Sequence, residues 1–245
     1  MRQLMIDIHA HVLPGIDDGP KTIEEALALL EQAVSDGIHT IVSCPHFGNG
    51  LYSPRVEKIL EIARSLQLKI KERSLALDLC IGMEIFFDLD ILKWHNSGRI
   101  LSINGGPYLC LELPSHNLPI YTAQVLFELR LKGYFPVLVH PERNLQVQSD
   151  PSKLSPLMDL GLLLAINSGS LTGRFGRRAY AAARYFLCEG MVSAICSDGH
   201  AAIGRPALLS EAVSEAGCLI GPNKAQELVS VNPRKILMGE PLAFL

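Results

Sequence analysis

The sequence predicts an α/β fold with a parallel sheet, and three observations point to this class. Seven short apolar runs alternate with segments of helical periodicity at intervals of about 30 residues, as in strands joined by helical crossovers. The runs are apolar on both faces, as expected of parallel strands that helices cover. No linker composition divides the 245 residues, so we expect one domain over residues 1–245, a length that single α/β barrels reach.

The N-terminal half is expected to contain three strands and two helices. The strands are predicted at residues 4–6, 40–44 and 76–84. Thr22 and Glu25 have the spacing of a capping box and begin an amphipathic helix that ends at Gly37. Ser53 and Pro54 have the order of an N-cap and a first-turn proline, so they are expected to begin the second helix.

The C-terminal half repeats this alternation. Four further strands are predicted at residues 108–112, 135–140, 162–167 and 192–196. Helices are predicted at residues 118–132, 156–160 and 177–189, and two more begin near Pro206 and Pro222. Gly133 and Gly190 follow two of these helices, where a residue that tolerates positive φ ends the helical pattern.

Composition and charge exclude several classes of function. The net charge is −3, with 22 basic and 25 acidic residues, so the chain has no general attraction for nucleic acid. Mean hydropathy is high at +0.23, but no apolar run approaches the roughly 18 residues of a membrane span. The strand pattern begins so close to Met1 that no signal peptide is expected. We therefore expect a cytoplasmic protein without membrane insertion.

Residues of metal-binding type stand at the C-terminal ends of six predicted strands. His9 and His11 follow the first strand, and strand alternation directs both to one side together with Asp7. The complete set is His9, His11, Asp18, His46, Glu84, Glu112, His140, Asp198 and His200. A single histidine or carboxylate at a strand end is usually an ordinary polar loop residue. Chance does not explain nine such residues at the same ends of six strands. Barrel enzymes carry their chemistry at this end of the strands.

The donor set predicts a cluster of ions. Nine donors exceed what one ion can use, and a structural zinc site would take four ligands, usually with cysteines. Imidazole and carboxylate together suit manganese, iron or zinc, and the choice among them stays open. Two or three divalent ions a few ångströms apart would use the whole set. Such clusters activate water and stabilise the oxygens of a transferring phosphoryl group.

Seven short motifs carry a resemblance to a known family. They are Asp7-Ile8-His9-Ala10-His11, Pro45-His46, Gly82-Met83-Glu84, Leu111-Glu112-Leu113-Pro114, His140-Pro141-Glu142-Arg143, Asn167-Ser168-Gly169-Ser170-Leu171 and Ser197-Asp198-Gly199-His200. In these motifs the chain resembles the polymerase and histidinol phosphatase (PHP) family. Residues 13–19, with the sequence LPGIDDG, resemble the bacterial capsule-locus protein tyrosine phosphatases in particular.

The resemblance implies a fold, a reaction and a partner. The fold would be a distorted (β/α)7 TIM-like barrel with a trinuclear metal centre. The reaction would be hydrolysis of phosphotyrosine by in-line attack of a metal-bridging hydroxide. The partner would be the tyrosine-rich tail of a bacterial tyrosine kinase that acts in capsule or exopolysaccharide synthesis. Whether the chain also forms a homo-oligomer stays open.

Roles for single residues follow from the same resemblance. The first ion would be held by His9, His11, Glu84 and Asp198; the second by Glu84 as a bridge, Glu112 and His140; the third by Asp18, His46 and His200. Arg143 would contact phosphate, and Arg205 would do the same or be a surface residue at a helix start. His200 or Asp198 would pass a proton to the leaving group by way of water.

Two departures and two rival functions remain. Ala10 and Phe47 replace a Cys and a His that these phosphatases often carry, and Phe47 puts substrate recognition at the cleft lip in question. One rival is a histidinol phosphatase or other small-molecule phosphomonoesterase; the other is a non-catalytic protein that binds a kinase tail. A cysteine-based phosphatase is excluded, because no cysteine is followed six positions later by arginine. Phosphate-loop and nucleophile-elbow motifs are also absent from the sequence.

Overall fold

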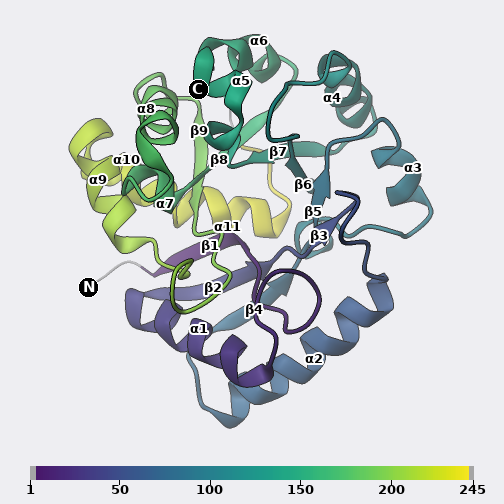
Figure 1. Ribbon diagram of the computed structural model, residues 1–245, viewed down its shortest axis with the longest axis vertical. Helices are drawn as coiled ribbons and strands as arrows, with labels where there is room; N and C mark the ends of the chain where they lie inside the picture. The colour runs from purple at the N-terminus through teal and green to yellow at the C-terminus, as the bar shows by residue number, and fades with distance from the viewer. Residues whose placement is uncertain (1–3, 243–245) are drawn as a thin grey trace.

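The computed structural model describes residues 4–242, in which parallel strands form two sheets (Figure 1). The three-stranded sheet has the order β1 (Met5–Ala10), β2 (Ile38–Ser43), β4 (Asp78–Ile81). The six-stranded sheet has the order β3 (His46–Phe47), β5 (Glu84–Phe86), β6 (Tyr108–Glu112), β7 (Phe135–Val139), β8 (Leu163–Asn167), β9 (Val192–Cys196). Each strand pair within both sheets is parallel, as predicted.

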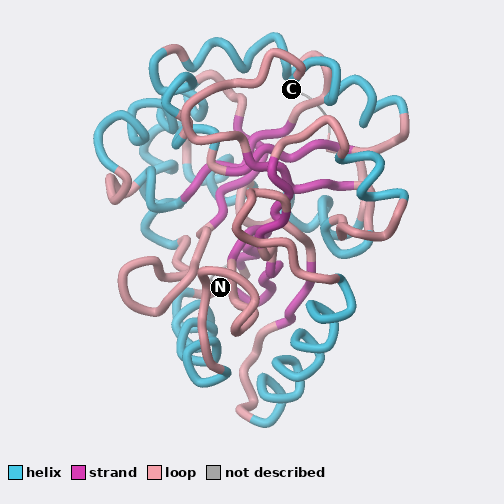
Figure 2. Tube along the Cα trace, turned by 45° about the vertical axis from the view of Figure 1, so that its right-hand side comes forward, coloured by secondary structure: helices cyan, strands magenta, loops and turns pink. Residues whose placement is uncertain are grey.

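Helices surround the strands on the outside of the molecule (Figure 2). They are α1 (Ile23–Asp36), α2 (Val56–Glu72), α3 (Ile91–Asn96), α4 (Thr122–Leu131), α5 (Leu145–Ser149), α6 (Ser155–Met158), α7 (Ser168–Leu171), α8 (Gly176–Cys188), α9 (Ser210–Ile220), α10 (Pro222–Glu227) and α11 (Val231–Met238). Three short 3-10 turns lie at Ile103–Gly105, Pro141–Arg143 and Pro151–Leu154. Within the described residues, no helix combines the length and hydropathy that crossing a bilayer requires.

The two sheets are joined where two chain segments pass from one sheet to the other. β2 continues into β3 through Cys44 and Pro45, and β4 continues into β5 through Gly82 and Met83. The single strand predicted over 76–84 is therefore wrong, because it divides between two sheets. A Cβ at Gly82 would lie 3.2 Å from the Cys44 Sγ atom and 3.4 Å from the Ile103 Cα atom, so a side chain at this crossing would be tightly packed.

The ring of strands closes between β1 and β9 without a continuous strand ladder. At the C-terminal end, the Asp198 amide donates to the His9 carbonyl (3.0 Å) and the His11 amide to the Gly199 carbonyl (2.8 Å). At the other end, the segment Leu228–Val229 lies between the strands. The Ile6 amide donates to the Val229 carbonyl (2.7 Å), and the Ile195 amide donates to the Leu228 carbonyl (3.0 Å).

The interior of the ring is apolar up to the last layer of side chains. One buried cluster takes alternate residues from six strands: Ile6, Ile8, Val42, Cys44, Tyr108, Cys110, Val137, Val139, Leu163, Ala165, Ala194 and Cys196. The same alternation continues to His46 after Cys44, to Glu112 after Cys110 and to Asp198 after Cys196. The apolar column therefore ends in the residues predicted to bind metal.

A bulge in β1 directs the first two histidines into this layer. Asp7 pairs with Ile41 and Ala10 with Ser43, so β1 has one residue more than β2 over this interval. Ile8 belongs to the interior cluster, and His9 also faces inward. The prediction that Asp7 shares a side with the histidines is wrong. Its carboxylate instead accepts hydrogen bonds from the amide and hydroxyl of Ser197 and from the His9 amide.

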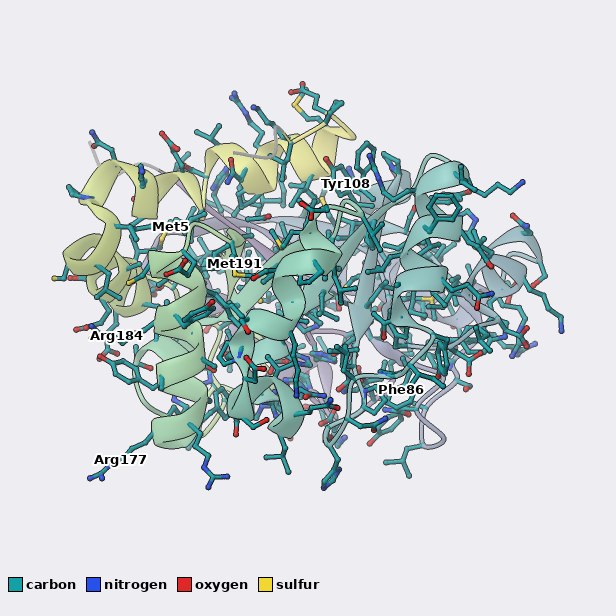
Figure 3. The ribbon with its side chains drawn as sticks, turned by 90° about the horizontal axis from the view of Figure 1, so that it is seen from above. Met5, Phe86, Tyr108, Arg177, Arg184 and Met191 are labelled. Carbon is teal, nitrogen blue, oxygen red and sulfur yellow. The ribbon has the colours of Figure 1, made fainter. Side chains whose placement is uncertain are left out.

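The two ends of the strands face opposite sides of the molecule. Figure 3 shows Met5 and Tyr108, at the starts of β1 and β6, on the upper side together with Met191, which precedes β9. Phe86, at the end of β5, lies on the lower side. The Tyr108 hydroxyl donates to the Glu240 carbonyl (2.5 Å), which fixes the chain after α11 across the upper end. The predicted metal ligands lie at the opposite, lower end.

Three helix starts differ from the predictions. α4 begins at Thr122, four residues after the predicted start at 118. α2 begins at Val56 with Arg55 as its N-cap, so Ser53 does not cap it. α9 begins at Ser210 rather than near Pro206, because the amides of Leu209 and Ser210 donate to the carboxylate of Asp36 from α1 (2.6 and 2.9 Å). Long-range contacts of this kind override the local signal that proline gives.

Replacement of Thr22 by Ala is expected to destabilise the fold without affecting catalysis. The Thr22 hydroxyl accepts from the Glu25 amide (3.2 Å) at the start of α1, as the capping-box spacing predicts. Loss of such an N-cap costs about 1 kcal/mol. Urea denaturation should show this decrease in unfolding free energy, while the turnover rate under native conditions stays unchanged. An unchanged denaturation midpoint would contradict the capping role.

Candidate metal centre

All nine predicted donors converge at the C-terminal end of the strands. Donor atoms within 4.8 Å of one another form four groups: His11, Asp18, His46 and His200; His9, His11 and Glu84; His9, His140 and Asp198; His46, Glu84 and Glu112. The groups share members, so they form one continuous cluster. The remaining three histidines of the chain, His39, His95 and His116, belong to none of these groups.

Glu84 lies at the centre of the cluster. Its Oε2 atom lies 3.0 Å from His9 Nε2, 2.9 Å from His11 Nε2 and 3.3 Å from His46 Nδ1. Its Oε1 atom lies 2.7 Å from His140 Nε2. The pairing of β5 with β3 and β6 sets this position, and the Glu84 side chain is fully buried. One carboxylate therefore faces four imidazoles from three different parts of the chain.

Asp18 closes the outer side of the cluster. Its Oδ1 atom lies 3.4 Å from His46 Nε2 and 3.3 Å from His200 Nε2. The His200 ring stacks on His11, with the ring centroids 4.0 Å apart. Asp18 is about two-fifths exposed, whereas His11 and His200 are buried. This side of the cluster is therefore the one that solvent and substrate can reach.

The two oxygens of Asp198 face different groups. Its Oδ2 atom accepts hydrogen bonds from Arg143 Nη1, Arg205 Nη2 and Asn167 Nδ2, each at 2.8 Å. Its Oδ1 atom faces imidazoles, at 3.6 Å from both His11 Nε2 and His200 Nδ1. One oxygen is thus fixed by cationic and amide donors, and the other remains directed at the cluster.

Mutual attraction keeps the central carboxylates ionised. Burial would raise the pKa of Glu84, but the adjacent imidazoles of His9, His140 and His11 hold it well below its usual value. For Asp18, burial is likewise outweighed by the imidazoles of His200 and His46, which lower its pKa. Burial and the neighbouring Glu84 raise the pKa of Glu112. Glu84 and Asp18 are therefore charged beside imidazoles, and bound cations would balance this charge in place of imidazole protons.

The unpaired atoms of the cluster fit divalent cations. Within residues 4–242, the buried polar atoms without a hydrogen-bond partner include Nδ1 and Nε2 of His9, Nε2 of His11 and His200, Nδ1 of His46 and Oε2 of Glu84. Unpaired buried polar atoms are costly, and native structures usually satisfy them with a partner or a bound ion. Imidazole nitrogens and carboxylate oxygens are suitable ligands for manganese, iron and zinc.

The backbone of two members adopts an unusual conformation. His140 has φ of 37° and Asp198 has φ of 53°, which is the left-handed region that residues with a Cβ rarely occupy. His140 directly follows β7, and Asp198 lies two residues beyond β9. Backbone of this kind costs free energy and is found where the fold requires a side chain at one place.

Three residues outside the predicted set orient its members. Asp17 Oδ2 lies 2.7 Å from His11 Nδ1, and its Oδ1 atom accepts from the Gly19 amide (3.0 Å). Asn167 donates to Asp198, and the buried carboxylate of Glu142 accepts from the Asn167 amide (2.9 Å). Asp17 and Asp18 are adjacent in the sequence, which could not show that one faces the cluster and the other lies behind His11.

Replacement of Asp17 by Asn is expected to weaken metal binding 10–100-fold. The carboxylate accepts the proton of His11 Nδ1 and thereby leaves Nε2 free as a ligand facing Glu84. An amide at position 17 can present its NH2 group instead and favour the other tautomer. The measurement is activity as a function of free metal concentration. An equal loss of activity at saturating metal, with unchanged metal affinity, would contradict this role.

Comparison with known proteins identifies the family. Residues 5–238 match the family described as "Capsular polysaccharide synthesis, CpsB/CapC". CapC of Staphylococcus aureus is 36% identical over 207 residues, which cover 84% of this chain and 81% of that protein. CpsB of Streptococcus pneumoniae, named a tyrosine-protein phosphatase, is 34% identical over 243 residues, which cover 96% of this chain and 99% of that protein.

A solved structure agrees with these sequence matches. It is reported for YwqE of Bacillus subtilis and CpsB of Streptococcus pneumoniae, which its description names unique metal-dependent tyrosine phosphatases. The match has a TM-score of 0.93 and 31% sequence identity, and it covers 98% of this chain and 96% of that chain. It confirms the predicted PHP-type α/β fold. The chain belongs to the CpsB/CapC family of capsular polysaccharide synthesis.

Proposed function

We propose that the protein is a metal-dependent tyrosine-protein phosphatase whose active site is the cluster around Glu84. The observation that carries the proposal is the convergence of nine metal-type donors beside two arginines at the strand ends. The names of the relatives support the same activity. Two or three ions of manganese, iron or zinc would be held by the nine residues, and residues 1–245 would act as one domain.

The protein's own residues supply binding and orientation. Divalent ions held here would activate a water molecule and neutralise charge on the phosphoryl oxygens. Arg143 and Arg205 each give one donor to Asp198, and Arg205 Nη1 also lies 3.5 Å from Asp18 Oδ2. Both guanidiniums keep further N–H donors for phosphate oxygens, Arg143 more than Arg205. A cavity of about 80 Å³ lies beside Glu112, His140 and Arg143. We assign phosphate binding to Arg143 and Arg205, and delivery of a proton to the leaving oxygen to His200 or Asp198 through water.

An aromatic surface adjoins the exposed side of the cluster. The Tyr52 ring stacks on His46, with ring centroids 5.9 Å apart and an interplanar angle of 12°. Phe47 instead packs into the core against Trp94, with centroids 5.3 Å apart. Leu51 and Ile203 are almost fully exposed, in the loops that carry Tyr52 and Arg205. Aromatic and apolar side chains at this place favour a phenyl phosphate over a small polar phosphate.

The substrate follows from these features and from the family. We propose phosphotyrosine on the tail of a bacterial tyrosine kinase that acts in capsule or exopolysaccharide synthesis. Kinases use cytoplasmic nucleotide, so we place the reaction in the cytoplasm. The phenolic leaving group, with a pKa near 10, needs less protonation than an alkoxide.

Comparison of substrates tests the proposal. The metal-loaded protein should hydrolyse a phosphotyrosine peptide with a higher kcat/KM than a phosphoserine peptide or histidinol phosphate. A preference for histidinol phosphate would move the assignment to small-molecule phosphatases. Lack of turnover on all three substrates, with metal bound, would favour a non-catalytic protein that binds a kinase tail.

A further inference from the structure

A group of arginines on α8 lies beside the active site and has no role in it. From Leu160 to Cys188 the chain contains four arginines and no acidic residue, although its net charge is −3. Three of the four are exposed: Arg177 and Arg178 lie in the first turn of α8, and Arg174 lies two residues before it. We call these three residues the α8 arginines.

The α8 arginines are connected to the site through Phe175. The Arg143 guanidinium lies 4.5 Å from the centre of the Phe175 ring, and Arg143 also binds Asp198. The Phe175 ring packs closely against Gly169, where a Cβ would lie only 2.7 Å from it. Arg174 directly precedes Phe175, so its Cα atom lies on the order of 10 Å from the Arg143 guanidinium. Figure 3 shows Arg177 at the same lower side as Phe86, the side of the strand ends.

These side chains are not used within the described part of the protein. Among residues 4–242, no carboxylate lies within 4.0 Å of the side-chain nitrogens of Arg174, Arg177 or Arg178. Arg177 lines a cavity of about 400 Å³ together with Glu211 and Glu215 of α9, so acidic groups bound the positive surface on that side. Arg174 and Arg178 do not line this cavity. Arg184, two turns further along α8, differs because it donates to the Tyr180 hydroxyl (2.9 Å).

We propose that the α8 arginines bind acidic residues that flank the phosphotyrosine of a peptide substrate. The proposal rests on the proposed phosphatase activity and adds a requirement for the sequence around the target. An extended peptide advances about 3.3 Å per residue, so residues about three positions from a phosphotyrosine held at Arg143 would reach Arg174. Exposed charge pairs contribute little one at a time, but a group of them steers a charged partner and lowers KM.

The test compares two peptides on two variants. One peptide carries glutamates on both sides of phosphotyrosine, and the second carries glutamines at the same positions. The double variant Arg174→Gln/Arg178→Gln removes two charges, and Arg184→Gln on the same helix is the matched control. At low ionic strength the double variant should lose about three- to tenfold in kcat/KM on the glutamate peptide, mainly through KM. The wild type should prefer the glutamate peptide, and added salt should reduce this preference.

The remaining measurements separate the possible failures. Turnover of the glutamine peptide and of p-nitrophenyl phosphate should be unchanged in the double variant, and Arg184→Gln should behave as the wild type. An equal loss on both peptides would overturn the inference, because it would indicate a structural effect. Equal turnover of both peptides by the wild type would also overturn it, while leaving the phosphatase activity intact. A wild-type protein that hydrolyses neither peptide would instead refute the proposed function.

Discussion

Removal of metal with a chelator is expected to abolish hydrolysis of phosphotyrosine completely. The cluster brings Glu84, Asp18 and Asp198 together with five imidazoles, and six buried atoms of this set have no partner within the described protein. Only bound cations can make such a set into a catalyst, because the arginines alone provide neither an activated water nor a nucleophile. The measurement is the turnover rate before and after dialysis against a chelator, with metal content determined in parallel.

Restoration of activity distinguishes metal loss from unfolding. Addition of manganese, iron or zinc should revive turnover, whereas calcium should not, because calcium prefers oxygen ligands and this set is rich in imidazole. Circular dichroism of the chelated protein should show that the helices remain. Full activity in protein that is shown to contain no metal would refute the role assigned to the cluster.

Replacement of Glu84 by Gln should reduce turnover more than about 100-fold. Mutation of a residue that only hydrogen-bonds to a metal ligand costs 10–100-fold, and Glu84 is itself a proposed ligand. Gln has nearly the same shape as Glu but carries no charge. Its NH2 group would donate to the imidazole nitrogens that are the proposed metal ligands. Glu84 contacts His9, His11, His46 and His140, so the change affects most of the cluster at once. Metal content and kcat should therefore fall together.

A second buried carboxylate provides the matched control. Glu142 is fully buried, as Glu84 is, but it accepts hydrogen bonds from the Asn167 amide and the Ser170 hydroxyl (2.9 and 2.8 Å). Burial raises the pKa of Glu142, so a neutral amide at this place is a milder change. Glu142→Gln should keep its metal and lose less than tenfold in turnover. Similar losses in both variants would mean that Glu84 acts through folding alone.

The site could be predicted from the sequence because it depends on a simple rule of parallel sheets. Glu112 ends β6 and His140 directly follows β7, and parallel strands bring such ends together. His46 and Glu84 instead begin β3 and β5, just after the chain has left β2 and β4. The nine predicted donors are the same nine residues whose donor atoms form groups within 4.8 Å of one another in the structure. Their grouping by distance also joins His11 to Asp18 and His140 to Asp198, which the sequence could not specify.

The features that the sequence could not predict arise from irregular backbone and from long-range contacts. The bulge between Asp7 and Ala10 shifts the alternation of inward and outward side chains in β1 by one residue. No residue type in this segment indicates the bulge. The segment 76–84 divides because β4 pairs with β2 whereas β5 pairs with β3 and β6, and these partners are distant in the sequence. The roles of Asp17 and Asn167 likewise arise from partners that only the fold brings near.

The segment Leu228–Val229, which lies as a wedge between β1 and β9, has a consequence for biosynthesis. The carbonyls of Leu228 and Val229 accept hydrogen bonds from the amides of Ile195 and Ile6. β9 and β1 are therefore joined by residues that are synthesised after both strands. A nascent chain on the ribosome lacks this wedge until Val229 has left the exit tunnel. Ions present during translation would therefore meet an incomplete set of ligands, and stable metal binding should follow the emergence of residues 228 and 229 from the ribosome.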